Sequence, residues 1–435
     1  MAGEEPLQVD RSTFERLVGE HRKLREDVDL LLRCLGHAST PCESSWEFHR
    51  RKFEAALQRE PLVAASSLTD VLPYGLLRSV QHHCGSRAET LALRSASRGC
   101  GACAGNIFRG HEIYACGGRD VAHAGRPLQT AERLHLQSRA WEALPPPPRA
   151  GRLGCAGAAL RGRMYVCGGG VGPSASTAIR FDPCRREWED LPSMSARRKG
   201  AAAAAAVGRL FVIGGSDSAE RTVHTSAESF DPDAPSPRPA AGRGRWELLP
   251  GGMAEPRRSF AAAAIAVGGN AEIVVSGGTT LPIGQEGNGH APHASAEALG
   301  LTGGGAVWRR LSPMAVPRAG HAAAALGGRI FVCGGSVGDG VGLATVECFD
   351  PAVEGPAAWT SSTPMNVGRS CPAAAVLSGR LYVLGGSRHW TRGTPAEQSA
   401  ECFDPVTAHW EAAPTLLEPR SEFCAGAVWS GALVA

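Results

Sequence analysis

RLFVIGG, at residues 209–215, decides the fold, because near copies of it recur along the chain. The other clear copies are RMYVCGG at 163–169, RIFVCGG at 329–335 and RLYVLGG at 380–386. Such runs of β-branched and aromatic residues are typical of buried strands. The first glycine of a Gly-Gly pair stands at Gly117, Gly168, Gly214, Gly277, Gly334 and Gly385. A lone tryptophan follows each pair, at Trp141, Trp188, Trp246, Trp308, Trp359 and Trp410. Successive pairs are 46 to 63 residues apart, a spacing that suits one four-stranded blade of a β-propeller.

Alanine-rich segments precede the Gly-Gly pairs, as at 200–207 and 321–326. By local propensity, consecutive alanines favour a helix. We predict strands instead, because the innermost strands of a radial array converge on its axis, where only small side chains fit. After each pair comes a strand that ends at an Asp-Pro turn, clearest in AESFDP at 227–232 and VECFDP at 346–351. The aspartates are interpreted as turn formers and the tryptophans as packing between blades.

This combination resembles the kelch family, whose motif joins a Gly-Gly pair to a Tyr or Phe just before it and a Trp well after it. The resemblance covers roughly residues 98–435. It implies an all-β, kelch-type β-propeller, a fold that most often serves as a protein-binding platform. We predict six blades. The alternative is a seventh, incomplete blade, in which the C-terminal segment 420–435 joins a strand near 88–93 to close the ring.

Residues 1–97 are predicted to form a small α-helical region. Apolar residues at steps of three and four predict a coiled-coil-like helix over 12–36, which would either make a homodimer or pack on the propeller. A second helix is predicted over 44–60.

Segment 67–98 is similar to an F-box, because Leu72-Pro73 opens a helix and a basic stretch ends the motif at Arg98. Tyr74 stands where the motif has an acidic residue, so the alternative is a pair of helices without special function. An F-box ahead of kelch repeats resembles the substrate receptor of a cullin-type ubiquitin ligase. That resemblance implies a Skp1-type adaptor and a cullin as partners.

The composition limits the classes of partner. A net charge of +3 gives no broad basic field for nucleic acid, and no run of residues approaches the length of a membrane span. Three of the 14 cysteines, Cys116, Cys167 and Cys333, occupy the same repeat position, where they cannot easily pair with one another. With no secretory signal at the N-terminus, we expect reduced thiols and a cytoplasmic or nuclear protein.

Arginines recur in register with the repeats and are the candidate protein-binding residues. They are Arg152, Arg198, Arg258, Arg318, Arg369 and Arg420, four of which stand 16 residues before the Gly-Gly pair. Rotational pseudosymmetry would gather them at one end of the channel, where guanidinium groups suit an acidic peptide or loop. In kelch relatives that bind acidic degrons, arginines from this segment make such contacts. The alternative is that the arginines merely cover the blade edges.

No catalytic residue, cofactor or metal site is predicted. Cys100 and Cys103 form a lone C-x-x-C pair, and His290 and His293 lack further ligands. Three of the four tyrosines precede a Gly-Gly pair, which argues against a copper-radical oxidase. A kelch-fold enzyme acting on carbohydrate through Arg and Glu, or a purely structural scaffold, stays as an alternative to the protein-binding propeller.

Overall fold

The computed structural model describes residues 111–429, except for 121–125, 137, 149–150, 171, 236–243, 269, 281–291, 303–304 and 390–393. The predicted helices at 12–36 and 44–60, the F-box-like segment 67–98, the 97/98 domain boundary and the Cys100–Cys103 pair lie outside the described residues.

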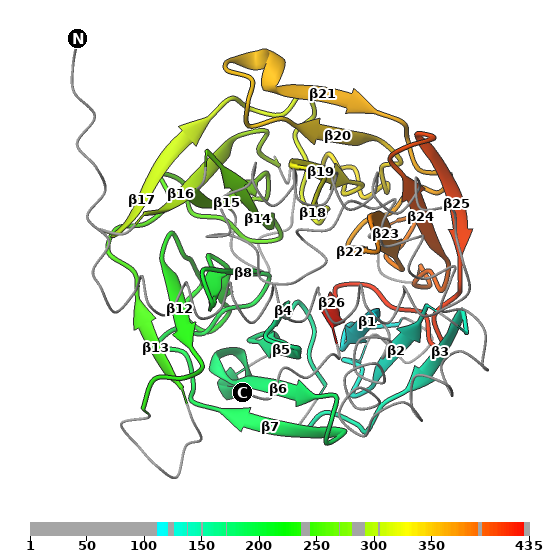
Figure 1. Ribbon diagram of the computed structural model, residues 1–435. Helices are drawn as coiled ribbons and strands as arrows, with labels where there is room; N and C mark the ends of the chain where they lie inside the picture. Colours follow the sequence, from blue (N-terminus) through cyan, green and yellow to red (C-terminus); the bar gives the residue numbers. More distant parts are fainter. Residues whose placement is uncertain are drawn as a thin grey trace, which may run out of the picture. The chain divides into compact units, whose positions relative to one another are not determined.

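Six four-stranded antiparallel sheets are arranged as blades around a central axis (Figure 1). The innermost strands are β26 (Cys424–Trp429), β4 (Ala156–Leu160), β8 (Ala202–Ala206), β14 (Ala261–Val267), β18 (Ala322–Leu326) and β22 (Ala373–Leu377). The second strands, which lead into the Gly-Gly pairs, are β1 (His111–Cys116), β5 (Arg163–Cys167), β9 (Arg209–Ile213), β15 (Asn270–Ser276), β19 (Arg329–Cys333) and β23 (Arg380–Leu384). The third strands are β2 (Ala131–His135), β6 (Ala178–Asp182), β12 (Ala227–Asp231), β16 (Ala296–Thr302), β20 (Val346–Phe349) and β24 (Ala400–Asp404). The outer strands are β3 (Ala140–Ala143), β7 (Glu187–Leu191), β13 (Arg245–Leu248), β17 (Gly305–Leu311), β21 (Trp359–Ser362) and β25 (His409–Ala413). The predicted six-bladed propeller is confirmed.

Short elements decorate the loops. A two-stranded ribbon joins β10 (Ser216–Asp217) to β11 (Thr222–Val223), and 3-10 helices span Gly172–Ser176 (η2) and Pro356–Ala358 (η4). Among the described residues, no helix has the length and apolar composition that a membrane crossing requires.

The alanine-rich segments are strands, as predicted against their helical propensity. Strand β8 lies between β4 and β14 of the neighbouring blades. Its alanines alternate, so that Ala202 and Ala204 pack with the blade of β14 while Ala203 and Ala205 pack with the blade of β4. Alternation is the normal consequence of strand geometry, and methyl side chains let neighbouring blades approach near the axis.

The ring is closed by the C-terminal strand. Strand β26 pairs antiparallel with β1, from Cys424 opposite Cys116 to Trp429 opposite His111. The C-terminal segment therefore supplies the innermost strand of the first blade, and the alternative of a seventh, incomplete blade is wrong. The other three strands of that blade come from residues 111–143, so one sheet contains both ends of the propeller.

The tryptophans link the outer edges of neighbouring blades, beyond simply filling space. Trp188 Nε1 donates to the carbonyl oxygen of Pro145 at 2.8 Å, and its ring lies 5.1 Å from that of Phe181. Equivalent bonds run from Trp141, Trp246, Trp359 and Trp410 to carbonyl groups of the preceding blade. Trp308 is the exception, because its Nε1 is buried without a partner among the described residues.

Each Gly-Gly pair packs against the backbone carbonyl of an arginine in the next blade, which accounts for both the glycines and the regular spacing of the arginines. A Cβ atom on Gly168 would lie 2.2 Å from the carbonyl oxygen of Arg198, at the start of the next blade. The N–H of Gly169 donates to that same oxygen at 2.9 Å. All six pairs repeat this contact with the next blade, so the absence of a side chain is required at each one.

Candidate functional site

The register arginines are buried structural groups. Arg198, Arg318 and Arg369 have no exposed surface, and Arg152 and Arg420 have 2% or less. The predicted ring of guanidinium groups open to a partner at the channel end is therefore wrong for these five. The alternative of arginines that solvate the blade edge is wrong as well, since the groups face the protein interior.

Each buried arginine joins two blades. The carbonyl of Arg198 accepts from Gly169, whereas its side chain reaches forward into its own blade. Its Nη1 donates to the carbonyl oxygen of Gly214 at 2.8 Å, and its Nε donates to Glu228 Oε1 at 3.0 Å. Glu228 also accepts the backbone N–H of Ser195 at 2.7 Å. Because both charges are fully buried and mutually satisfied, the pair fixes the segment that connects the blades.

In the fourth blade this structural role belongs to Arg257, not to Arg258. Arg257 Nη1 donates to the carbonyl oxygen of Gly277 at 2.8 Å, and Nη2 donates to Glu297 Oε1 at 3.0 Å. Arg258 is displaced by one residue and lines the central cavity. It is also buried, with 3% exposed surface, but of the six candidates it alone is among the residues that line the cavity.

The second blade lacks the carboxylate. Arg152 donates to the carbonyl oxygen of Gly168 at 2.9 Å and to Thr177 Oγ1 at 2.8 Å. Strand β6 carries Ile179 at the position of Glu228. No ion pair reaches Arg152 from the described residues, and its buried Nε has no hydrogen-bond partner among them.

A closed ring of backbone hydrogen bonds surrounds the axis beside these arginines. The N–H of Gly154 donates to the Glu422 carbonyl, Gly200 to Gly154, Ser259 to Gly200, Gly320 to Ser259, Cys371 to Gly320 and Glu422 to Cys371, at 2.6–3.1 Å. All six residues have φ between 53° and 67°, a left-handed conformation that glycine adopts most easily. Three of them are not glycine, and these three, Ser259, Cys371 and Glu422, place side chains at the axis.

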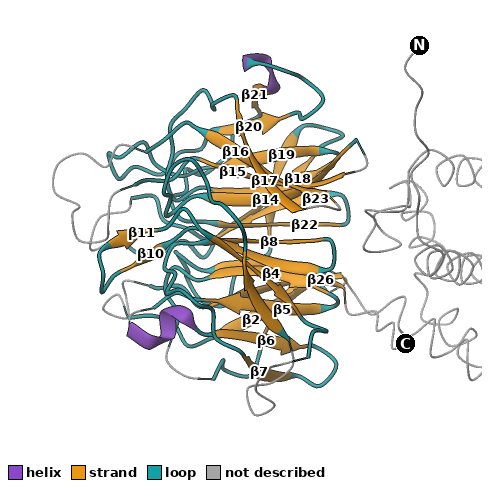
Figure 2. Cartoon of the chain, turned by 90° about the vertical axis from the view of Figure 1, so that its left-hand side faces the viewer, coloured by secondary structure: helices purple, strands orange, loops and turns teal. Residues whose placement is uncertain are grey.

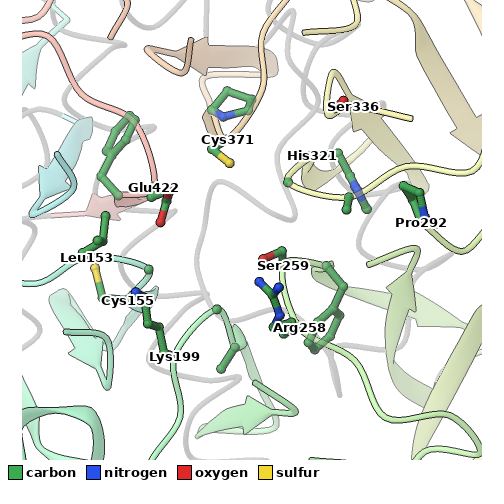
Figure 3. Close-up of a pocket in the computed structure, with 18 of the residues that line it drawn as sticks. Leu153, Cys155, Lys199, Arg258, Ser259, Pro292, His321, Ser336, Cys371 and Glu422 are labelled. Atoms are coloured by element: carbon green, nitrogen blue, oxygen red, sulfur yellow. The ribbon is translucent and has the colours of Figure 1, made fainter. Parts of the chain in front are cut away.

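A cavity of about 440 Å³ lies at this ring (Figure 3). Its charged lining residues are Arg119, Lys199, Arg258 and Glu422. Arg119 Nη2 and Glu422 Oε1 form an ion pair of 2.8 Å. The balance of formal charge in the lining is therefore positive.

His321 and Cys371 also line the cavity, and both are neutral groups. Burial and the nearby Arg318 charge lower the pKa of His321 to about 3, and Ser276 Oγ lies 3.2 Å from its Nε2. Burial and the Glu422 charge raise the pKa of Cys371 to about 12. No group of His, Cys, Asp or Glu in the described part of the chain is arranged to hold a metal ion.

The cavity belongs to one end of the blades, which we call the loop face. It comprises the loops after the Gly-Gly pairs, such as 214–226 and 334–345, and the segments that connect the blades, such as 192–201 (Figure 2). Val337 and Val341 are exposed on one of these loops, and Leu417 is exposed on a connecting segment. The opposite face carries the connections from the first to the second and from the third to the fourth strand of each blade, including the Asp-Pro turns.

The Asp-Pro aspartates are turn formers, as predicted, and also bind arginines. Asp182 Oδ1 accepts the backbone N–H of Cys184 at 2.9 Å, while Oδ2 accepts from Arg163 Nε at 3.0 Å. These aspartates form ion pairs at the opposite face with the arginines that begin the second strands.

Sequence reasoning missed Arg119, Lys199 and Glu422. Two of them could have been found from the register itself, since Lys199 follows Arg198 by one position and Glu422 follows Arg420 by two. Those positions line the cavity, whereas Arg152, Arg198, Arg318, Arg369 and Arg420 do not.

Comparison with known proteins agrees with the geometry of a kelch-type propeller. A family model described as the Kelch motif matches residues 100–148, 151–195, 197–251, 317–354 and 368–417. These segments cover more than half of the chain, and the chain therefore belongs to the kelch-repeat family. The fourth blade, which has Arg257 out of register and Trp308 without its bond, falls between the matched segments.

Curated relatives match over only part of their length. Kelch-like protein 36 of Rattus norvegicus is 27% identical over 270 residues, which are 60% of this chain and 39% of that protein. Alpha-scruin of Limulus polyphemus is 30% identical over 32% of this chain and 16% of its own length. An F-box/kelch-repeat protein of Arabidopsis thaliana is 33% identical over 25% of this chain and 22% of its own. The solved structure of YjhT aligns with a TM-score of 0.52 at 15% identity, covering 70% of this chain and 95% of that one, and shares the fold.

Proposed function

We propose that this protein binds a partner protein through the loop face, with a segment of the partner entering the central cavity. The observation that carries the proposal is the cavity itself, which is lined by residues from all six segments that precede the innermost strands. Binding residues are commonly placed on loops that a rigid scaffold positions. The buried arginine–glutamate pairs supply that rigidity.

The charge of the cavity favours an acidic segment of the partner. Lys199 and Arg258 contribute two positive charges, while the Glu422 carboxylate is already paired with Arg119. The net formal charge of the lining would attract a carboxylate side chain or a chain terminus that enters the cavity. The acidic ligand predicted from the sequence is thus retained, with Arg258 kept from the predicted set and Lys199 added to it.

The cavity does not favour the alternative of an enzyme acting on carbohydrate. Glycoside hydrolysis ordinarily uses two carboxyl groups on opposite sides of the scissile bond. Among the described lining residues, Glu422 is the single carboxylate. We therefore assign the cavity to recognition.

The role we favour for such a propeller is substrate receptor of a cullin-type ubiquitin ligase. Support comes from the F-box-like pattern in 67–98 and from relatives whose names join F-box to kelch repeats. In this arrangement the propeller holds the substrate while 67–98 holds a Skp1-type adaptor. Dimerisation through 12–36 would present two propellers.

Site-specific cross-linking tests the binding face. A photoreactive amino acid is placed at Val341 on the loop face or at Val406, an exposed residue of the opposite turns. We expect a partner, identified by mass spectrometry, to cross-link at Val341 and not at Val406. Capture from Val406 alone would overturn the proposed face.

Charge reversal tests the acidic ligand. Lys199→Glu should abolish cross-linking of that partner from position 341, whereas Arg185→Glu, at an exposed turn of the opposite face, should leave it unchanged. Equal cross-linking by both variants would contradict recognition of an acidic segment.

The receptor role has its own test. Purification of the full chain should recover a Skp1-type adaptor and a cullin, and deletion of 67–98 should remove both while keeping the Val341 cross-link. Recovery of neither by the intact chain would refute the ligase role and leave the binding face standing.

A further inference from the structure

Three cysteines meet where the ring closes. Cys116 ends β1, Cys424 begins β26, and Cys155 directly precedes β4. The thiols of Cys155 and Cys424 both point to the Cys116 carbonyl oxygen, at 3.8 and 3.7 Å. All three are buried and reduced. The site therefore joins the C-terminal strand of the first blade to the innermost strand of the second.

The same site contains a buried cation without a carboxylate. Arg152 is 2% exposed and has Ile179 where the other five blades have glutamate. Its Nε is buried without a partner among the described residues. An unneutralised charge in the interior is costly, so an anion beside it would be stabilised. The Arg152 charge acts on Cys155, three residues further along the chain, and favours its thiolate.

The cysteines of this cluster differ in how their surroundings act on them. A hydrogen bond with Cys424 and the Arg152 charge lower the pKa of Cys155, although burial opposes this. Burial raises the pKa of Cys116 and of Cys167 to about 12. The hydrogen bond with Cys155 and burial raise the pKa of Cys424 well above its usual range. We assign the nucleophile to Cys155 on its position, because it is three residues from Arg152 and lines the central cavity, whereas Cys424 is not among the lining residues.

Cys155 is the member of the cluster that borders the central cavity, and it is 7% exposed. Cys155 lines the central cavity together with Lys199, as Figure 3 shows. Hydrogen peroxide, which is close to water in size, would approach the sulfur from this cavity. The exposed Cys184, at a turn of the opposite face, lies in no such environment.

We propose that Cys155 is a peroxide-reactive cysteine, and that Cys424 resolves its oxidised form into a disulfide across the ring closure. The Cys155 thiolate attacks one oxygen of hydrogen peroxide, the O–O bond breaks, and the products are a sulfenic acid and hydroxide. The hydroxide takes the proton of Cys424, whose sulfur then attacks the sulfenic sulfur and expels a second hydroxide, which leaves as water after protonation. In total, two thiols and one peroxide give one disulfide and two waters, so that both sulfurs are oxidised and the peroxide is reduced.

The disulfide would change how the ring is held. In the reduced protein, β26 is kept in place by the β1 ladder and the Arg420 contacts. A covalent bond from Cys424 to Cys155 would tie this strand to the second blade as well. Peroxide would thereby add a covalent link to a closure that non-covalent contacts otherwise hold.

Peptide mapping of the full chain tests the proposal. After one equivalent of hydrogen peroxide at pH 6.5, we expect a Cys155–Cys424 disulfide peptide while Cys184 remains a thiol. In Cys424→Ser, a cyclic 1,3-dione probe should label Cys155 as the sulfenic acid. Oxidation of Cys184 before Cys155 would overturn the proposal, as would sulfenic acid without disulfide in the unaltered chain.

Substitutions of Ile179, in the surroundings of Arg152, test whether the Arg152 charge makes Cys155 reactive. Ile179→Glu restores the carboxylate of the other blades, so it should neutralise Arg152 and slow Cys155 oxidation about tenfold, the effect of one pKa unit on the thiolate fraction. Ile179→Leu, which keeps the volume and adds no charge, should leave the rate unchanged. Equal rates in Ile179→Glu and the unaltered chain would refute the part assigned to Arg152.

Discussion

Replacing Glu228 by isoleucine would create in the third blade the situation that the second blade has naturally. Glu228 is fully buried and accepts from Arg198 Nε at 3.0 Å and from the backbone N–H groups of Ser195 and Ala196 at 2.7 and 3.3 Å. Glu228→Ile leaves the Arg198 guanidinium in the interior without its anion. Breaking a buried pair in this way costs about 3–5 kcal/mol.

That cost is large enough to measure. For a domain of this size, the unfolding entropy scales so that 3–5 kcal/mol corresponds to a fall in Tm of about 4–8 °C. The assay is thermal unfolding followed by tryptophan fluorescence, at one fixed heating rate. Glu189→Ala is the control, because Glu189 is 44% exposed in its ion pair with Arg180 and should cost no more than about 1 kcal/mol. A Glu228→Ile shift no larger than the control's would refute the view that these pairs hold the blades together.

Further variants address other repeated contacts. His321→Phe should remove a pH dependence: the pKa of buried His321 is lowered to about 3, so the unfolded chain binds the proton first as pH falls below its ordinary value of about 6.5, and the native protein loses stability between these values. The measured quantity is the Tm of the variant minus the Tm of the unaltered chain, which should be larger at pH 4 than at pH 7. The same Tm difference at both pH values would contradict a His321 that is buried in its neutral state. Gly168→Ala should destabilise by more than Gly172→Ala, since both glycines have positive φ but a Cβ meets a carbonyl 2.2 Å away at Gly168 and nothing within 4 Å at Gly172; urea midpoints compare them, and equal losses would exclude the steric cause. Trp410→Phe should cost about 1 kcal/mol more than Trp308→Phe in the same measurement, because only Trp410 gives up an inter-blade hydrogen bond, and a larger loss at Trp308 would argue against that link.

Much of the fold could be predicted because the repeats outweigh local preference. Six consecutive alanines around Ala202 favour a helix in isolation, but their place before RLFVIGG identified them as an innermost strand. Ring closure was harder, since the pairing of β26 with β1 joins residues about three hundred positions apart. No local signal in Cys424–Trp429 names its partner strand.

The site could not be predicted to the same extent. Periodicity places Arg198 and its equivalents at one end of the blades, but it does not say whether a side chain turns to the axis or into its own blade. The direction of the Arg198 side chain is set by Glu228, because a carboxylate buried in the interior is stabilised by a cation beside it. The pairing of Arg198 with Glu228 depends on which strands are neighbours, which the sequence around either residue does not show. For the same reason the sequence predicts Arg258 in the fourth blade, where Arg257 makes the equivalent contacts.

The order in which the ribosome makes this chain bears on its assembly. Of the described strands, β26 is synthesised after all the others, and the first blade lacks its inner strand until β26 is made. During translation the nascent chain must wait as an open arc, with the edge of β1 unpaired and available to any competing strand. A chain that ended before residue 424 would keep the first blade without its inner strand and the edge of β1 unpaired by β26.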